Sequence, residues 1–350
     1  MHREHAETQS RGGDAATARS DQIARSRAIQ RRTGKTFHLA TRLLPRRIRH
    51  DTYVLYAFFR MADEVVDDAG VLDPAAQRDR LERLRAAALG EVDPRDPVLD
   101  AFAAVHERTG IPTADVNAFV DAMLTDIDTV RYETYEDLEA YMDGSAAAVG
   151  RMMTAIMDLP PEREAEALPH ATALGEAFQL TNFLRDVRED VVERDRVYLP
   201  VETLRAHGVS EGEVRDLAFS DAFAAAMADE MDRTERLYRE GVAGIRYLPE
   251  DCQFAVTLAA VLYADHHRLI RERGYDVLAE TPALSTRRKL SVLVRTALAW
   301  HVLRDPEATF DRVSAIRAGT PTDHADGQAE SRTGILDRVP TGLLDRLSIR

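Results

Sequence analysis

Apolar residues recur at helical spacing from about residue 21 to about residue 317. Ala, Leu, Arg and Glu dominate this part, and the alternating β-branched runs typical of strands are missing. The pattern predicts an all-α fold of about ten or eleven helices. The expected breaks contain Pro or Gly and lie at 44–45, 70–74, 93–97, 110–112, 159–161, 199–200, Gly208, 248–249, Gly274 and 281–282.

The two ends of the chain lack this periodicity. Residues 1–20 are polar, and residues 318–350 mix Gly, Thr, Ser and Asp with scattered leucines. We therefore predict a disordered N-terminal tail and a flexible C-terminal tail. Because no long Gly/Ser/Pro linker interrupts residues 21–317, we expect one domain there rather than two.

One predicted helix, residues 53–68, carries a narrow polar stripe in an apolar coat. Tyr56, Arg60, Asp63 and Asp67 follow one another at spacings of 4, 3 and 4, which places them on one helix face. Most of the remaining circumference is apolar, and a helix of this kind is buried. The stripe must therefore face a cavity or another polar stripe.

Residues 175–192 repeat this arrangement. Gln179, Asn182, Asp186 and Asp190 follow at spacings of 3, 4 and 4 and are flanked by large apolar side chains. A single pair of acids four residues apart is usually a solvated face, but two such stripes, each coated by apolar residues, indicate a site. Facing carboxylates in an apolar interior provide hard oxygen ligands for Mg²⁺, which binds one or two carboxylates together with substrate phosphates.

Composition and charge narrow the classes of protein. With 46 basic against 60 acidic residues the net charge is −14, so we expect the protein as a whole to be repelled by nucleic acid and by anionic membrane surfaces. The single Cys252 excludes an internal disulfide framework and a multi-cysteine zinc site, in keeping with a reducing cytoplasm. The longest apolar stretch, 254–264, is about half of the roughly 20 residues needed to span a bilayer, and the first residues contain no secretory h-region. We expect a cytoplasmic protein.

The motifs, taken in order, resemble those of the squalene and phytoene synthase family of head-to-head prenyl synthases. The matching blocks are KTF at 35–37, LLP at 43–45, LYAFFRMADEVVDD at 55–68, Tyr141 with GSAAAVG at 144–150, FQLTNFLRDVREDVVERDRVYLP at 178–200, GIRYLP at 244–249, Tyr263 and GYDV at 274–277. They extend over nearly all of residues 25–300. Within the family they are most similar to phytoene synthases, especially those of halophilic archaea.

This resemblance implies an isoprenoid synthase fold, a helical bundle with a central cavity, and a prenyltransferase of carotenoid biosynthesis. Such an enzyme condenses two geranylgeranyl diphosphates through the cyclopropyl compound prephytoene diphosphate to phytoene. The implied cofactor is Mg²⁺, for which Mn²⁺ substitutes, without NADPH. Its metal ligands would be Asp63, Asp67, Asn182, Asp186 and Asp190.

The resemblance also implies roles for residues beside the aspartates. Substrate binding is expected at Lys35, Thr36, Phe37, Arg60, Gln179, Asn182 and Arg185, and the two arginines suit diphosphate oxygens. Catalytic roles are expected for Tyr56, Arg60, Tyr141, Arg185 and Tyr263; Phe183 is a further aromatic candidate, and Glu64 and Glu189 would support the metal sites. For each aromatic residue a purely structural place in the core stays open.

The sequence departs from the family pattern at Glu280, where the family commonly has a diphosphate-binding Arg. Arg287, Arg288 and Lys289 are candidate substitutes. The run of small residues 144–150 admits two interpretations, a close helix contact and the border of a substrate cavity.

Residues 21–50 hold nine basic residues against Asp21 alone, which admits either a solvated face or peripheral contact with the inner face of a membrane. Lys35 and Lys289 are the only lysines, so the acidic, lysine-poor composition reflects either a saline cytoplasm or a GC-rich genome.

Two alternatives to a phytoene synthase stay open. A C30 synthase that makes dehydrosqualene, squalene or hydroxysqualene from farnesyl diphosphate would use the same motifs on a shorter donor. An inactive helical partner protein of the same fold would be expected to have lost some of the aspartates in the two stripes. This chain keeps Asp63, Asp67, Asp186 and Asp190.

Overall fold

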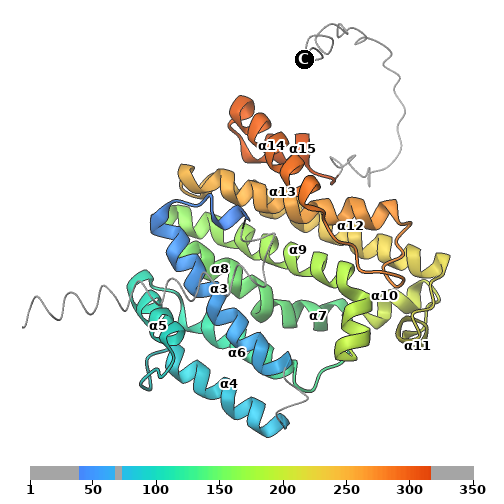
Figure 1. The fold of residues 1–350 in the computed structure, drawn as a ribbon, viewed down its shortest axis with the longest axis horizontal. Coiled ribbons are helices and arrows are strands. Elements are labelled where there is room, and N and C mark those ends of the chain that lie inside the picture. Colours follow the sequence, from blue (N-terminus) through green and yellow to red (C-terminus); the bar gives the residue numbers. More distant parts are fainter. Residues whose placement is uncertain (1–38, 68–72, 317–350) are drawn as a thin grey trace, which may run out of the picture. The chain divides into compact units, whose positions relative to one another are not determined.

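The computed structural model describes residues 39–67 and 73–316, and within these ranges the chain is helical without a β-strand (Figure 1). The predicted all-α class is therefore confirmed. The described residues form α3 (Arg46–Asp67), α4 (Pro74–Ala88), α5 (Pro97–Thr109), α6 (Thr113–Thr125), α7 (Tyr135–Met142), the π-helical turn η1 (Asp143–Ala147), α8 (Ala148–Ala155), α9 (Pro161–Arg194), α10 (Val201–Ala206), α11 (Glu211–Arg215), α12 (Asp221–Ala243), the 3-10 turn η2 (Gly244–Tyr247), α13 (Glu250–Glu272), α14 (Thr286–Leu303) and α15 (Pro306–Val313).

Thirteen α-helices in these ranges exceed the ten or eleven predicted. The prediction counted too few helices because it relied on Pro and Gly to mark the breaks. Breaks without either residue, such as the connection at 126–134, divide the chain into additional, short helices. The predicted tails at 1–20 and 318–350 lie outside the described residues, so these boundaries stay a prediction.

Local sequence explains where several helices begin. Proline occupies the first turn of α4 and α5, where its missing N–H costs no helical hydrogen bond. Asp73 accepts a hydrogen bond from the Ala76 N–H at 2.8 Å, and Asp96 accepts one from the Val98 N–H at 2.8 Å. These caps satisfy backbone donors that the first helical turn leaves unpaired.

Helix α9 is the central element of residues 39–316 (Figure 1). It is 34 residues long and packs against α12, α8, α13 and η1. The contact with η1 is so close that a Cβ atom on Gly175 would lie 2.5 Å from the Ala146 carbonyl oxygen. Glycine at 175 therefore sets the separation between α9 and the turn that precedes α8.

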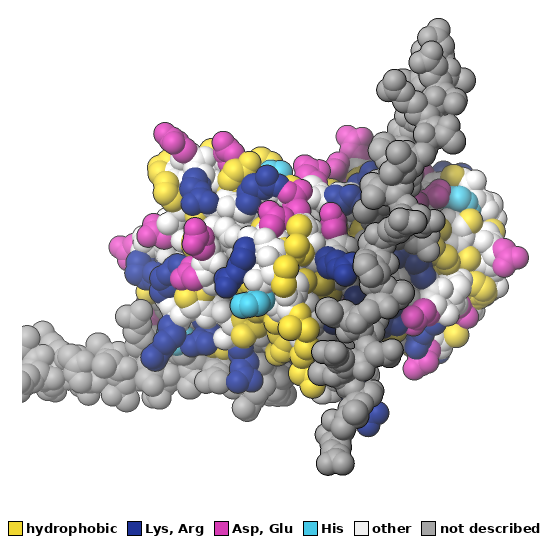
Figure 2. All heavy atoms as spheres, turned by 90° about the horizontal axis from the view of Figure 1, so that it is seen from above, with side chains coloured by type: hydrophobic (Ala, Val, Ile, Leu, Met, Phe, Trp, Pro, Cys, Tyr) yellow, Lys and Arg dark blue, Asp and Glu magenta, His cyan; other side chains and the backbone are white. Residues whose placement is uncertain are grey.

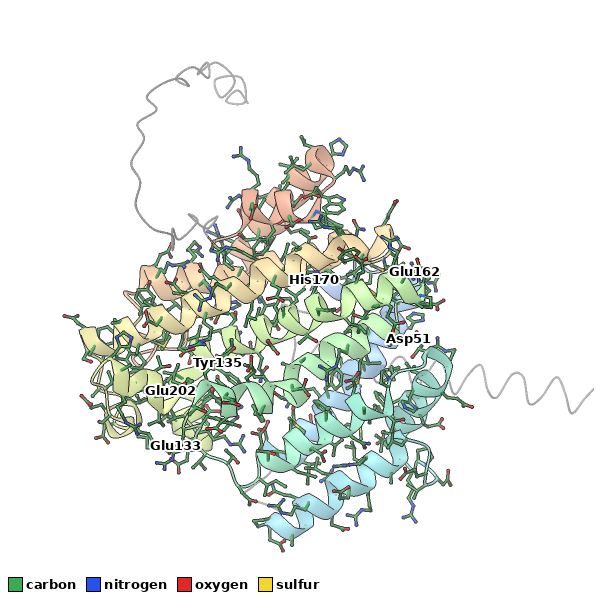
Figure 3. All side chains as sticks on the ribbon, turned by 180° about the vertical axis from the view of Figure 1, so that it is seen from behind. Asp51, Glu133, Tyr135, Glu162, His170 and Glu202 are labelled. Atoms are coloured by element: carbon green, nitrogen blue, oxygen red, sulfur yellow. The ribbon has the colours of Figure 1, made fainter. Side chains whose placement is uncertain are left out.

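Hydrogen bonds between α10 and the start of α7 hold these two short helices together. Figure 3 shows Glu133, Tyr135 and Glu202 near one another, where the start of α7 meets α10. The Tyr135 N–H donates to the Glu202 carboxylate at 2.7 Å, and the Glu202 N–H donates to the Glu133 carbonyl at 3.0 Å. These bonds tie the segment before α7 to the segment after α9. Among the described helices, none combines the length and apolarity that crossing a membrane requires.

Candidate active site

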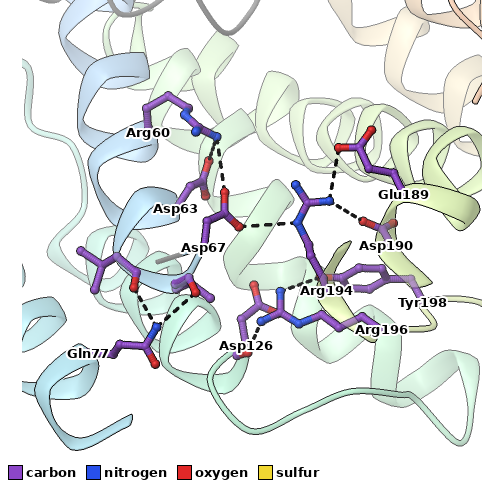
Figure 4. Close-up of polar contacts among 12 residues, drawn as sticks. Arg60, Asp63, Asp67, Gln77, Asp126, Glu189, Asp190, Arg194, Arg196 and Tyr198 are labelled. Carbon is purple, nitrogen blue, oxygen red and sulfur yellow. Dashed lines mark hydrogen bonds and ion pairs between the residues drawn. The ribbon is translucent and has the colours of Figure 1, made fainter. Parts of the chain in front are cut away.

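The first polar stripe lies on α3. Arg60 forms ion pairs with Asp63 at 3.5 Å, with Glu64 at 3.9 Å and with Asp67 at 4.0 Å. The end of α3 is fixed from α4, because the Gln77 amide donates to the Val65 and Val66 carbonyls at 2.9 and 3.1 Å (Figure 4). Gln77 thus satisfies carbonyls of the last helical turn and holds Asp67 in place.

The second stripe lies on the C-terminal half of α9. The Arg185 Nε atom donates to the Asp186 carboxylate at 2.7 Å, and the Asn182 amide donates weakly to Gln179 at 3.5 Å. Burial alone would lower the pKa of Arg185, but the hydrogen bond and the negative charge of Asp186 hold it above its ordinary value. Arg185 and Asp186 form an ion pair at the cavity wall.

The two stripes face each other, as the sequence predicts, and Arg194 joins them. Its guanidinium lies 3.5 Å from Asp67 on α3 and 3.1 Å from Asp190 on α9, with Glu189 at 3.3 Å (Figure 4). Sequence reasoning did not single out Arg194. A signal was present, since Arg194 continues the spacing of four from Asp186 through Asp190.

Burial makes two of the stripe carboxylates, Asp63 and Asp190, harder to ionise. Burial raises the pKa of Asp190 to about 7, against the opposing effect of Arg194, and 11% of its side chain is exposed. Burial likewise raises the pKa of Asp63 to about 7, with Arg60 opposing; its side chain is 39% exposed because it faces the cavity. Both carboxylates would gain from additional positive charge.

Both stripes line one cavity of about 570 Å³. The predicted catalytic, substrate-binding and metal-binding residues within the described ranges all border it; they are Tyr56, Arg60, Asp63, Asp67, Tyr141, Gln179, Asn182, Arg185, Asp186, Asp190 and Tyr263, together with Phe183 and Glu189. Glu64, which was expected to support the metal site, is not part of the cavity wall and pairs with Arg60 at 3.9 Å. Lys35, Thr36 and Phe37 lie outside the described residues.

An aromatic wall continues the cavity beyond the charged end. Phe183 and Tyr198 stack with ring centroids 4.0 Å apart, and Tyr141 lies 6.0 Å from Tyr198. The Tyr141 hydroxyl donates to one Asp126 oxygen at 2.8 Å, while the other Asp126 oxygen has no hydrogen-bond partner among the described residues. Burial raises the pKa of Asp126 to about 6.

Asp126 and Tyr198, with the neighbouring Arg196, are cavity residues that the sequence analysis did not identify. Arg196 donates to the Asp126 backbone carbonyl and lies 3.9 Å from its carboxylate. A signal for Asp126 was its position as an acid directly after the apolar α6; no periodicity pointed to Tyr198.

A second, apolar cavity of about 130 Å³ adjoins the first. Val149, Met153, Gly175 and Phe178 border both cavities, so the two lie next to each other, and no Asp, Glu, Lys or Arg borders the second one. Its remaining wall comes from α8, α9, α12, η2 and α13, together with residues 40–44, Met157 and Leu248. The combined space has a polar, charged end and an apolar end.

In the run of small residues 144–150, some residues make close helix contacts and others border the charged cavity. A Cβ atom on Gly144 would lie 2.9 Å from the Ala118 carbonyl carbon, and one on Gly150 would clash with the Ala171 carbonyl. These glycines permit close packing. Ser145 and Ala146 instead border the charged cavity, where their small size leaves space.

The described residues contain no cluster of three or more His, Cys, Asp or Glu side chains that could hold a metal ion by itself. Arg60 and Arg194 lie between the carboxylates instead. This donor set fits a divalent ion of the Mg²⁺ type, which takes one or two carboxylates and completes its shell with phosphate oxygens and water. The raised pKa values of Asp63 and Asp190 are in keeping with this fit, because burial disfavours the charged form of both carboxylates and a bound cation would offset that cost.

The family model described as squalene/phytoene synthase matches residues 30–293. The chain belongs to the squalene/phytoene synthase family. This match covers the two aspartate stripes, the aromatic wall and the apolar cavity, and it confirms the family expected from the motifs. Enzymes of this family use prenyl diphosphates and generally depend on a divalent metal.

Individual relatives agree with this family assignment. The chain is 35% identical over 286 residues to a phytoene synthase of Thermus thermophilus, covering 80% of this chain and 94% of the relative. It is 32% identical over 299 residues to a 15-cis-phytoene synthase of Synechococcus elongatus, covering 80% and 93%. A crystal structure of a dehydrosqualene synthase in complex with ligand aligns with a TM-score of 0.71 at 31% identity, covering 80% of this chain and 97% of that one. The expected isoprenoid synthase fold is thus confirmed.

The predicted substitutes for the family arginine at the Glu280 position are not part of the charged cavity's wall. Glu280 pairs with Arg273 at 3.4 Å, and Arg288 pairs with Asp265 through a 2.7 Å hydrogen bond. Neither Arg287, Arg288 nor Lys289 borders the charged cavity. The cations at its wall are Arg60, Arg185, Arg194 and Arg196.

Proposed function

We propose that the protein is a phytoene synthase of the 15-cis type, which joins two geranylgeranyl diphosphates head to head. The observation that carries the proposal is the pair of adjacent cavities, one charged where α3 faces α9 and one apolar, which share Phe178 in their walls. A diphosphate suits the charged end and a long prenyl chain suits the apolar end. Relatives called phytoene synthase support the choice of reaction.

The arginines and carboxylates at the charged end are assigned to the diphosphates. Arg60 and Arg185 bind diphosphate oxygens in this assignment, and Arg194 releases its carboxylates when the substrate arrives. Mg²⁺, or Mn²⁺ in its place, would be held by Asp63, Asp67, Asn182, Asp186 and Asp190. When bound, the ion stabilises the negative charge of the departing diphosphate.

The apolar and aromatic walls are assigned to the carbocations. Ionisation of one donor gives an allylic cation that alkylates the double bond of the second donor, and loss of a proton closes the cyclopropane ring of prephytoene diphosphate. The second ionisation is followed by rearrangement and loss of another proton. Tyr56, Phe183 and Tyr263 exclude water from these cations and face them with aromatic rings.

Tyr141 is assigned to the final proton. Its hydroxyl already donates to Asp126 at 2.8 Å, so the phenol oxygen can accept the substrate proton while its own proton passes to Asp126. Two donors then yield one hydrocarbon, two diphosphates and two protons. The balance needs no reductant, and we therefore propose that NADPH is not used.

A C30 synthase is the second candidate, favoured by the likeness to a dehydrosqualene synthase. Incubation with equal farnesyl and geranylgeranyl diphosphate, with and without NADPH, followed by hydrocarbon extraction, distinguishes the two. A predominance of C40 hydrocarbon without NADPH supports the proposal. A predominance of C30 hydrocarbon, or dependence on NADPH, refutes it and leaves the fold and the site in place.

The aspartates distinguish an enzyme from an inactive partner protein. Asp63→Asn and Asp186→Asn are expected to abolish turnover with little loss of stability, because each removes a metal ligand and relieves crowding of carboxylates. Asp232→Asn, at an exposed position of α12, is the matched control. Near wild-type turnover in either cavity variant would remove that residue from the metal site.

The proposed place of the enzyme is the cytoplasm, with peripheral contact at the inner face of a membrane, because the proposed product is a water-insoluble hydrocarbon. We also propose adaptation to high salt, for which the acidic composition is the supporting observation.

A further inference from the structure

Helix α14 exposes a row of large apolar side chains. Only Val292 and Thr296 of this helix are buried, whereas Leu290, Val294, Leu298 and Val302 are 59%, 49%, 64% and 78% exposed. Their spacing of four places them along one ridge. With Leu303, α14 supplies five of the ten large hydrophobic residues exposed in the described ranges. Such concentration indicates a contact surface rather than scattered surface residues.

The same helix is basic in a protein of net charge −14. Its sequence contains no Asp or Glu and four basic residues, of which Arg288 is committed to Asp265. Arg287 and Arg295 are exposed next to the apolar row and form no ion pair with other described residues. Figure 2 views the molecule from above, the side on which Figure 1 draws α14, and shows apolar side chains with both basic and acidic ones around them on this face.

We propose that α14 docks the protein on an anionic bilayer, with Leu290, Val294, Leu298 and Val302 in the interface and with Arg287 and Arg295 near lipid phosphates. An apolar row flanked by unpaired cations is the arrangement of helices that lie in the plane of a membrane surface. Basic residues at such a surface gain from the negative potential of anionic lipids. The docking surface itself does not depend on the proposed function. Only its biological purpose, which is to bring a cavity that forms a hydrocarbon close to lipid, rests on that function.

Other parts of the chain match this surface less well. Residues 317–350 carry five arginines and five acidic residues, and residues 1–38 carry eight basic and four acidic residues, so neither terminal segment offers an excess of negative charge. A second copy would bring the same arginines against those of the first if the two rows paired about a two-fold axis. Anionic lipid complements both the charge and the apolar row.

The position of α14 connects this surface to the cavity. Helix α14 packs on α13, where the Trp300 ring lies 5.8 Å from that of Phe254. Ala255, Val256 and Ala259, on the same stretch of α13, form part of the apolar cavity wall. Docking through α14 therefore brings the α13 wall of the apolar cavity close to the bilayer.

Vesicle flotation with the full chain tests the proposal. Vesicles contain phosphatidylcholine alone or phosphatidylcholine and phosphatidylglycerol at three to one. We expect the wild type to bind the anionic vesicles. Val294→Ser combined with Leu298→Ser should lower partitioning at least tenfold. Arg287→Gln combined with Arg295→Gln should lower it less, by an amount similar to the effect of added salt on the wild type. Val92→Ser with Phe219→Ser, which alters exposed apolar residues elsewhere, is the matched control and should bind as wild type.

A second measurement tests whether the row is covered by protein. An environment-sensitive fluorophore on Val302→Cys should emit as in water without lipid and shift to the blue with anionic vesicles. A blue emission before lipid is added would show that a terminal segment or a second copy occupies the row, and would overturn the proposal. Absence of binding, or equal binding to neutral and anionic vesicles, would also overturn it.

Turnover in detergent micelles separates this inference from the proposed function. The α14 variants should keep wild-type turnover there, because none of these residues borders either cavity. Vesicle binding by a protein that makes no phytoene would refute the proposed function and leave the docking surface standing. Phytoene formation by a protein that does not bind vesicles would refute the docking surface alone.

Discussion

Replacing Ala259 by leucine should shift the product from C40 toward C30 hydrocarbon. Ala259 lies on α13 in the wall of the apolar cavity, which has a volume of about 130 Å³. Geranylgeranyl diphosphate is one five-carbon unit longer than farnesyl diphosphate, and in the proposed function the apolar cavity holds the end of the chain. A larger side chain in this wall therefore competes with the additional unit and leaves the shorter donor unaffected.

The size of the effect follows from the carbons displaced. Leucine adds three carbons to alanine, and each carbon removed from water contributes about 0.8 kcal/mol, so the longer donor should lose about 2 kcal/mol of binding in the transition state. The ratio of kcat/KM for geranylgeranyl over farnesyl diphosphate should then fall roughly thirtyfold. Thermal stability should stay equal or rise slightly, since the side chain fills an existing cavity.

Competition between the two donors, with C30 and C40 hydrocarbons quantified from one extract, measures this ratio directly. Ala225→Leu adds the same carbons at an exposed position of α12 that borders neither cavity, and it should leave the ratio unchanged. An unchanged ratio in folded Ala259→Leu would show that the apolar cavity does not hold the prenyl chain.

Three further outcomes are expected. Gly144→Ala should lower the free energy of unfolding by about 1–3 kcal/mol, because its Cβ atom would lie 2.9 Å from the Ala118 carbonyl carbon, as urea denaturation would measure. Glu176→Gln should raise the melting temperature at pH 8 but not at pH 4, because burial raises the pKa of this carboxyl from 4.5 to about 7 and its ionisation then opposes folding. The protein should lose stability in dilute buffer relative to a few molar KCl, because 60 acidic residues repel one another where screening is weak.

Each outcome has a control or a contrary result. Gly212→Ala, whose nearest neighbour would be 3.9 Å from the added Cβ atom, should be neutral or slightly stabilising. For Glu176 the wild type should lose stability as pH rises from about 4.5 to about 7, and a gain that is equal at both pH values would contradict the pKa argument. Its charged neighbours are Glu139, Asp143, Glu240 and Arg151. A melting temperature independent of KCl would favour GC bias over halophily.

Much of the site was visible in the sequence because helical spacing is a local property. The spacing of Asp63 and Asp67, and of Asp186 and Asp190, determines which helix face carries the carboxylates wherever the helices pack. Proline and glycine likewise determined where many helices begin and end, since their effects on the backbone are local. The apolar coats of both helices predicted burial, and burial of two acidic stripes predicted that they meet.

Tertiary structure decided which side chains join the two stripes and what surrounds them. Arg194 bridges Asp67 and Asp190 because α3 ends opposite the last turns of α9, a relation between residues far apart in sequence. Asp126 and Tyr141 meet because the residue that follows α6 lies against the last turn of α7, and hydrophobic periodicity does not reveal such a contact. The apolar row of α14 has the same composition as a buried face, and only the packing of the helix, which buries Val292 and Thr296 instead, leaves that row exposed. Spacing determines which residues share a face, whereas packing determines what that face meets.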